Sequence, residues 1–219
     1  MRSSAVLAIV LLVVASATCL SAPVDYDVVD RVVQAYNDLG SFSVKLYYSV
    51  NLQLRHMEGT GSFAMEVWQS PDYIRVTCSG SEASEGLSWS SQCTTLVTDI
   101  AQGIEHCLSP KGEWTTRKAR YNHLLDVLPM PSMDELDSIQ EGYLDGHPVW
   151  ILTVAEPDVS MTYSVDRASH FVRKVTGERE FLEQGARIAW VMTIDPPQIG
   201  VPEGVFDLDA IASNPGGVR

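Results

Sequence analysis

The feature that most constrains this chain is a long alternation of apolar and polar residues over 41–55, SFSVKLYYSVNLQLR. Every second residue from Phe42 to Leu54 is apolar or aromatic, and most residues between them are polar. Because successive side chains of a strand point to opposite faces, the pattern predicts one strand with a dry face and a wet face. The run is well beyond the usual strand length of about five or six residues, which favours a strongly twisted antiparallel barrel or half-barrel.

Shorter alternating runs follow and predict a meander of about ten strands. Residues 62–68 alternate, and Pro71 opens a run in which Ile74, Val76 and Cys78 share one face. Two runs at 93–99 and 103–108 resemble a hairpin, and further runs follow residue 140. The predicted class is therefore mainly β.

Helical periodicity is confined to an N-terminal segment and an insert. Residues 25–40 place valines at helical spacing and end at Gly40, which predicts an amphipathic helix. Residues 115–129 are predicted as a second helix, and Ser132 with Glu135 has the spacing of a capping box. Two readings stay open at this point: a filled sandwich or closed barrel, and a curved sheet with space beneath covering helices.

Residues 1–22 have the pattern of a secretory signal peptide. Arg2 precedes an apolar stretch, residues 5–17, that is too short for a comfortable membrane span. Cleavage after Ala17 and after Ser21 are alternatives, and Cys19 raises the alternative of a lipid anchor, although the preceding residues match a lipobox weakly. We expect a single domain over residues 23–219.

The charge of the chain excludes one class of partner. Residues 1–22 hold one basic and no acidic side chain, so their removal changes the formal net charge from −13 to −14. Such a charge repels nucleic acid and anionic membrane surfaces. We therefore expect no nucleic-acid partner.

The cysteines suggest a disulfide rather than a reactive or metal-binding site. Cys78, Cys93 and Cys107 remain after signal cleavage, and an exported chain can keep disulfides. Cys78 and Cys93 flank a Ser/Gly-rich loop symmetrically, which favours a bridge between them; Cys93–Cys107 is the alternative. The C-x-x-C spacing of zinc and thioredoxin-like sites is absent.

No catalytic pattern stands out. The sequence lacks G-x-S-x-G, H-E-x-x-H and a phosphate-binding glycine loop. We expect no enzyme activity, catalytic residue, cofactor or metal. Arg117, Lys118 and Arg120 form a basic cluster in an acidic chain, read either as a solvated helix face or as a contact for lipid headgroups or an acidic partner.

An ordered set of segments carries a family resemblance. In chain order they are LGSFSVKLYYSV, GTGSFAMEVWQSPDYIRV, TTLVTDIAQGIEHCLSPKGEW, YLDGHPVWILTV, YSVDRASHFVRKV and PPQIGVPEGVFDLD. This order resembles the LolA/LolB-like lipoprotein-carrier superfamily, which includes the RseB-type N-terminal domain. The resemblance implies an unclosed antiparallel β-barrel with an N-terminal helix and a helical lid insert, which enclose an apolar cavity for acyl chains.

The resemblance also implies a site, a location and partners. It implies a monomeric carrier of lipid or lipoprotein acyl chains in the periplasm or cell envelope; the alternative is an RseB-type envelope-stress regulator that binds a membrane-anchored partner. One departure is Ser70, since the lipoprotein carrier has an arginine before the proline of this strand. The residues expected to line the cavity are Val44, Leu46, Tyr48, Val50, Phe63, Met65, Ile74, Val76, Met130, Met133 and Trp190.

Overall fold

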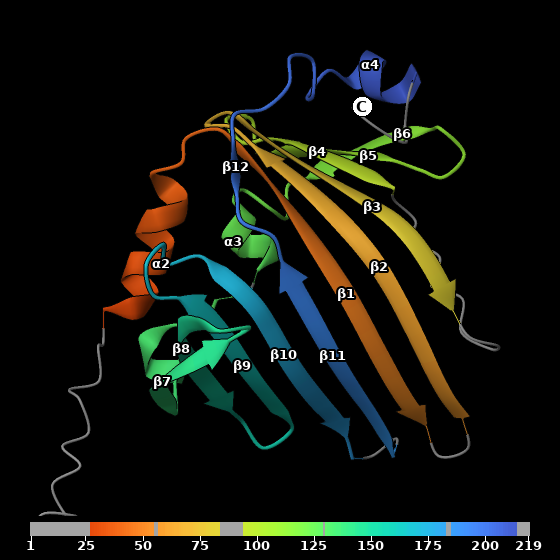
Figure 1. Cartoon of the computed structure of the whole chain (residues 1–219). Helices are drawn as coiled ribbons and strands as arrows, with labels where there is room; N and C mark the ends of the chain where they lie inside the picture. The colour runs from red at the N-terminus through yellow and green to blue at the C-terminus, as the bar shows by residue number, and fades with distance from the viewer. Residues whose placement is uncertain (1–26, 55–56, 84–93, 129, 183–184, 214–219) are drawn as a thin grey trace, which may run out of the picture.

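The structure is a computed structural model that describes residues 27–54, 57–83, 94–128, 130–182 and 185–213 (Figure 1). The expected signal peptide and Cys19 lie outside these ranges. The elements are α2 (Val28–Asn37), β1 (Phe42–Leu54), β2 (Met57–Gln69), β3 (Tyr73–Ala83), β4 (Thr95–Asp99), β5 (Ile104–Leu108), β6 (Trp114–Lys118), α3 (Leu124–Val127), the 3₁₀ turn η1 (Met133–Glu135), β7 (Ser138–Leu144), β8 (His147–Ala155), β9 (Val159–Asp166), β10 (Val172–Phe181), β11 (Ala186–Ile194), β12 (Gln198–Ile199) and α4 (Leu208–Ser213).

The strands form one antiparallel sheet that does not close. Its order is β6-β5-β4-β3-β2-β1-β11-β10-β9-β8-β7, and β12 pairs with the start of β1. The predicted fold class, a mainly β unclosed barrel with few helices, is confirmed. The sheet has twelve strands rather than about ten, since β6 and the short β12 were not predicted as strands.

Strand β1 lies at the centre of the sheet and defines its two faces. Leu46 pairs with Met65 of β2 on one side and with Ile194 of β11 on the other. Directly paired residues point to the same face of a sheet. We call the face that carries Leu46 the inner face; helices α2 and α3 lie on this side of the long strands (Figure 1).

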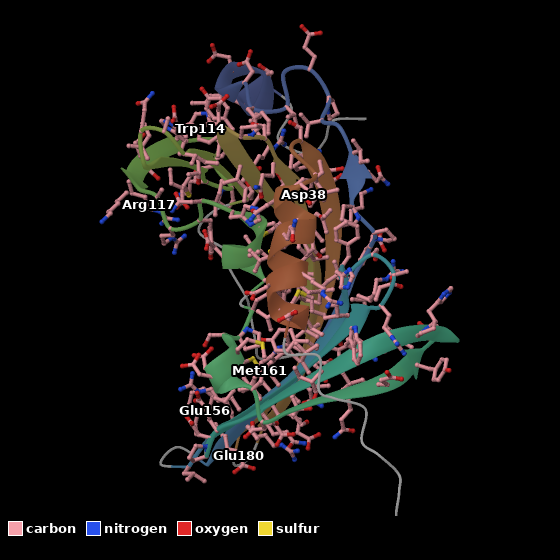
Figure 2. All side chains as sticks on the ribbon, turned by 90° about the vertical axis from the view of Figure 1, so that its left-hand side faces the viewer. Asp38, Trp114, Arg117, Glu156, Met161 and Glu180 are labelled. Atoms are coloured by element: carbon pink, nitrogen blue, oxygen red, sulfur yellow. The ribbon has the colours of Figure 1, made fainter. Side chains whose placement is uncertain are left out.

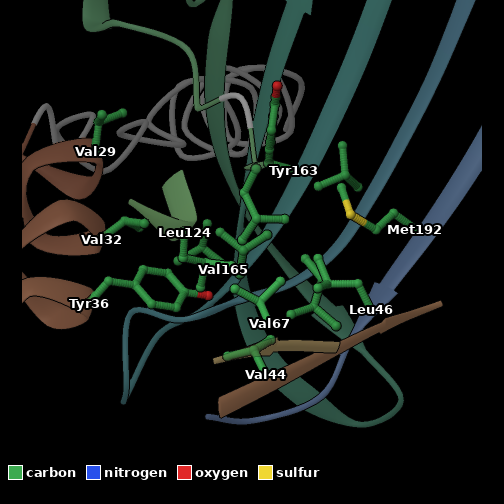
Figure 3. Close-up of a cluster of buried hydrophobic side chains, with 14 of the residues drawn as sticks. Val29, Val32, Tyr36, Val44, Leu46, Val67, Leu124, Tyr163, Val165 and Met192 are labelled. Atoms are coloured by element: carbon green, nitrogen blue, oxygen red, sulfur yellow. The ribbon is translucent and has the colours of Figure 1, made fainter. Parts of the chain in front are cut away.

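The core lies between α2 and the inner face. Val28, Val29, Val32 and Tyr36 are the buried stripe of α2, as the valine spacing predicted. In Figure 3 this stripe points toward the side chains of β1, β2, β9 and β11 and toward Leu124 of α3. The chain leaves the helix through Gly40, whose φ of +66° is a conformation that favours glycine.

The outer face is covered at one end by the C-terminal segment. Arg75 of β3 is 2 % exposed, and its guanidinium carbon lies 4.7 Å from the ring centroid of Trp68. The same guanidinium donates a hydrogen bond of 3.0 Å to the carbonyl of Val205. Burial lowers the pKa of Arg75, and Glu66 raises it. Ile211 of α4 packs nearby against a small cluster that includes Val97 and Leu108.

The helix predicted over residues 115–129 is wrong in its first half. Trp114–Lys118 is strand β6, which pairs with β5 over its whole length, so strand pairing overrides the local helical preference. Only Leu124–Val127 is α-helical. The predicted capping pair is confirmed, because the Glu135 carboxylate accepts a hydrogen bond of 2.8 Å from the Ser132 N–H.

The predicted bridge between Cys78 and Cys93 is wrong. Cys78 is a free thiol, whereas Cys107 is disulfide-bonded. The physical reason is register: the Cys78 N–H donates to the carbonyl of Thr94, so Thr94 rather than Cys93 lies opposite Cys78. Cys93 itself lies outside the described residues. Burial raises the pKa of the Cys78 thiol, which keeps it protonated and weakly reactive.

Candidate ligand-binding face

The inner face divides into two halves along strand β1. Near the N-terminal end of the strand, Val44 and Leu46 are buried beneath α2 and α3. Further along, Tyr48, Val50 and Leu52 point to the same face but are only partly buried, and Leu54 is 37 % exposed. We call the first part the upper inner face and the second part the lower inner face.

The lower inner face is continuous across five strands, β2, β1, β11, β10 and β9. Val50 pairs with Gly61 on one side and with Trp190 on the other, and Trp190 pairs with Gly177, which pairs with Met161. Apart from Leu54, its partly buried apolar residues include Tyr48, Val50, Leu52, Phe63, Met161, Ile188 and Trp190.

Glycines leave part of this face without side chains. Gly59 and Gly61 lie opposite Leu52 and Val50 in the register. The Trp190 indole lies across Gly177, and a methyl group at Gly177 would overlap it. A strand glycine allows close approach from above, and at Gly177 the Trp190 indole occupies that space.

An aromatic pair borders the two halves. The Tyr48 and Phe63 rings stack with centroids 4.6 Å apart and an interplanar angle of 8°. Burial raises the pKa of Tyr48, and the Cys78 thiol and the Tyr121 hydroxyl raise it further. Tyr48 therefore stays neutral, and this border carries no charge at physiological pH.

The insert between β6 and β7, residues 119–137, packs against the upper inner face. The Leu124 N–H donates a hydrogen bond of 2.7 Å to Oε1 of Gln69, a buried side chain of β2. His123 caps α3, because its Nδ1 accepts from the Leu125 N–H at 3.1 Å. Met130 and Met133 pack against the core and are partly buried. The insert thus covers apolar surface of the sheet with its own apolar side chains.

The expected cavity residues fall into two groups. All nine strand residues of the set lie on the inner face, as the alternation implied. Four of the eleven expected residues are fully packed core residues: Val44, Leu46, Ile74 and Val76. The other seven are partly buried: Tyr48, Val50, Phe63, Met65, Met130, Met133 and Trp190.

Sequence reasoning missed several residues of the lower inner face. Leu52 and Ile188 stand in the same alternating runs as Val50 and Trp190, so the signal was present in the sequence. Gly177 and Met161 join them only through the pairing of β9, β10 and β11. Of three hollows that the described residues line, the largest, about 440 Å³, includes Trp68 and Gln198, and another includes Leu54 at the end of the lower inner face.

Ser70, where the lipoprotein carrier has an arginine, has a local role. Its backbone N–H donates to the Tyr73 carbonyl at 2.8 Å, and its hydroxyl accepts from the Tyr73 N–H at 3.1 Å. The side chain therefore closes the turn between β2 and β3. Arg75 lies on the outer face, opposite to Ile74, and is held there by Trp68 and Val205.

The described residues contain no group of three or more His, Cys, Asp or Glu side chains placed to hold a metal ion. None of their helices combines the length and the apolar character needed to cross a bilayer.

No protein-family model and no curated protein matches the chain. Solved structures similar to it include a DUF1329 family protein from Desulfovibrio piger, with 12 % identity, TM-score 0.41 and coverage of 84 % of this chain and 96 % of that one. A putative outer membrane lipoprotein-sorting protein domain from Vibrio parahaemolyticus shows 9 % identity, TM-score 0.38 and coverage of 85 % and 97 %. MucB shows 13 % identity and TM-score 0.42, with coverage of 83 % of this chain and 61 % of the MucB chain.

Proposed function

We propose that this chain binds the acyl chain of a lipid or lipoprotein on the lower inner face and carries it within the bacterial cell envelope. The observation that supports this most is that only one half of the apolar inner face is buried. Val44 and Leu46 are buried, but Val50, Leu52 and Trp190 on the same face are not. An extended apolar surface of this kind on a soluble protein marks a binding site.

The free energy available to such a site is large. Each methylene that leaves water contributes about 0.8 kcal/mol. An acyl chain that crosses the row Gly61, Val50, Trp190, Gly177 and Met161 would bury many methylenes against apolar side chains. Release requires a competing cover for the empty face, and the methionines of the insert can supply one, because methionine adapts to irregular apolar surfaces.

The setting of this activity follows from the N-terminal pattern and the family resemblance. Residues 1–22 have the pattern of a secretory signal, so we place the chain in the periplasm or cell envelope. It acts there as a monomeric binding protein without catalysis.

Native mass spectrometry of the chain, purified from envelope without detergent, tests the proposal. We expect added mass that organic solvent extracts as lipid. Val50→Asp should remove this mass, because it places a charge on the lower inner face. Ser49→Asp is the matched control, since Ser49 is exposed on the outer face one residue away. A wild-type chain without bound mass that also fails to take up added lipid would contradict the proposal.

A second function, binding of an envelope protein partner, is favoured by one edge of the sheet. Strand β6 has a neighbouring strand on one side only within the described residues, and it carries Arg117 and Lys118. An edge strand can pair with an added strand, and basic side chains would favour an acidic one. Under this function Lys118→Asp would impair the chain in its host, whereas Val50→Asp would not.

A further inference from the structure

A buried carboxylate holds two arginines at the β6 edge of the sheet. Glu105 of β5 is 0 % exposed. Its Oε1 lies 2.6 Å from Nε of Arg117 and 3.5 Å from Nε of Arg120. One carboxylate neutralises one of the two guanidinium groups, so the cluster of Glu105, Arg117 and Arg120 keeps a net charge of about +1 at neutral pH. Within a chain of net charge −13 this cluster is a local exception.

The outward parts of both guanidinium groups remain accessible. The side chains of Arg117 and Arg120 are 42 % and 54 % exposed, and each contacts Glu105 through Nε. Within the described part of the chain, the terminal nitrogens of both guanidinium groups have no hydrogen-bond partner. A guanidinium whose Nε is fixed presents its remaining donors in a rigid fork, the geometry that matches phosphate oxygens.

The cluster belongs to the inner face rather than to the outer surface. Glu105 pairs with Arg117 on one side and with Thr98 on the other, and Thr98 pairs with Ile74 of the buried upper inner face. Figure 2 labels Arg117 among the β4–β6 strands. Lys118, one residue later, pairs with Ile104 and points to the outer face.

Two tyrosines connect the cluster to the apolar surface. The Arg120 guanidinium lies 5.7 Å from the ring centroid of Tyr121. Tyr121 lies near enough to Tyr48 to raise the pKa of its hydroxyl, and Tyr48 stacks on Phe63 at the border of the lower inner face. A polar group at the arginines and an apolar chain on the lower inner face therefore fit one amphipathic molecule.

We propose that Arg117 and Arg120 bind the phosphate of an anionic lipid headgroup, a role that rests on the lipid binding proposed above. Glu105 is a positioning residue, which accepts a hydrogen bond from the Arg117 Nε and forms an ion pair with the Arg120 guanidinium. The overall negative charge of the chain disfavours approach to anionic surfaces in general, so these two arginines would select the headgroup of a single bound molecule. The shared chemistry is a phosphate ester, and free inorganic phosphate is the other source of it.

Isothermal titration calorimetry with three probes separates these sources. The probes are dodecyl phosphate, dodecyl maltoside with the same chain and a neutral head, and inorganic phosphate. We expect dodecyl phosphate to bind at least about tenfold more tightly than dodecyl maltoside, since two charge-assisted contacts are added. Inorganic phosphate alone should bind far more weakly than either.

The variant for this experiment replaces the whole cluster, Glu105→Gln with Arg117→Gln and Arg120→Gln, because removing the arginines alone would leave a buried unpaired charge. It should bind both dodecyl probes equally and keep the wild-type affinity for dodecyl maltoside. The control, Lys111→Gln with Lys118→Gln, removes two exposed positive charges and should keep the tenfold preference. Arg117→Lys with Arg120→Lys keeps the charge without the forks and should lose part of the preference.

Three results would overturn the headgroup site. They are equal binding of both dodecyl probes by the wild type, an unchanged preference in the triple variant, and inorganic phosphate that binds as tightly as dodecyl phosphate. The first two, with tight dodecyl maltoside binding, leave the proposed lipid binding intact. Absence of dodecyl maltoside binding instead overturns the proposed function, whatever the arginines bind.

Discussion

The upper and lower parts of strand β1 carry the same kind of side chain on the same face, but only those of the upper part are buried. Val44 and Leu46 lie under α2 and the insert, whereas Val50 and Leu52 remain partly exposed. The alternation that runs through both parts is unbroken. The comparison shows that an apolar strand face can be packed core in one half and partly exposed surface in the other, depending on what covers it.

The largest expected difference between the halves is in stability. Leu46→Ala should lower the free energy of unfolding by about 3 kcal/mol, because it leaves a cavity in a packed core. Leu52→Ala should cost less than about 1 kcal/mol, because water already reaches that site. Urea unfolding followed by circular dichroism measures both. Equal losses at the two positions would mean that the lower face is packed like the upper one.

Gly177→Ala tests the shape of the lower inner face. The added methyl would overlap the Trp190 indole, and overpacking of this kind costs about 1–3 kcal/mol. We expect a shifted tryptophan fluorescence maximum and weaker lipid binding. In a Trp190→Ala background the same change should cost little, and a full cost there would show that the strain arises elsewhere.

Gln69→Leu tests how the insert is held over the upper face. It removes the acceptor of the Leu124 N–H and leaves a buried donor unpaired, at a cost of about 1–2 kcal/mol. Amide hydrogen exchange at residues 124–128 should accelerate more than exchange in β1. Gln53→Leu, at the exposed end of β1, is the control and should leave this exchange unchanged.

The smallest expected effect is a pH dependence of the α3 cap. Burial lowers the pKa of His123, while Asp126 raises it, and the net shift is downward from 6.5. The unfolded chain therefore takes up the proton first as pH falls, so the stabilisation by His123 is complete above pH 6.5 and declines below it. Protonated Nδ1 also cannot accept from the Leu125 N–H.

Exchange of the Leu125 amide, measured by NMR between pH 7.5 and pH 5 and corrected for the intrinsic rate, checks this expectation. Protection should fall as the pH is lowered. His123→Asn keeps a capping side chain that does not titrate, so its protection should stay flat. A parallel decline in that variant would assign the effect to other groups.

The sequence predicted most of what the backbone does locally. The run at 41–55 is strand β1, Phe42–Leu54, and the helix expected over 25–40 is α2, Val28–Asn37. Both have strong periodicity over many residues. The segment at 114–118 lacked such periodicity, and its strand follows from pairing with β5, which only the folded chain provides.

The candidate site was predictable in its face but not in its extent. Alternation alone places Val50 and Trp190 on one side of their strands. Alternation cannot predict that α2 and α3 leave these two residues uncovered, because the burial of a sheet face depends on how separate elements pack. The cysteine pairing failed for a related reason, since a one-residue offset in register moves a side chain to the other face.

The pairing of β1 with β11 has a consequence for how the chain is made. Strands β1 to β3 are neighbours along the chain, but the second edge of β1 stays open until β11 has been synthesised. Pairing between strands so distant in the chain forms slowly, and an open strand edge is a template for aggregation. The Arg75 side chain likewise cannot be enclosed until Val205, whose carbonyl accepts its hydrogen bond, has been synthesised. Until β11 has been synthesised, the chain therefore exposes an unpaired edge of β1 that can aggregate. A chaperone that binds extended segments would protect this edge during that interval.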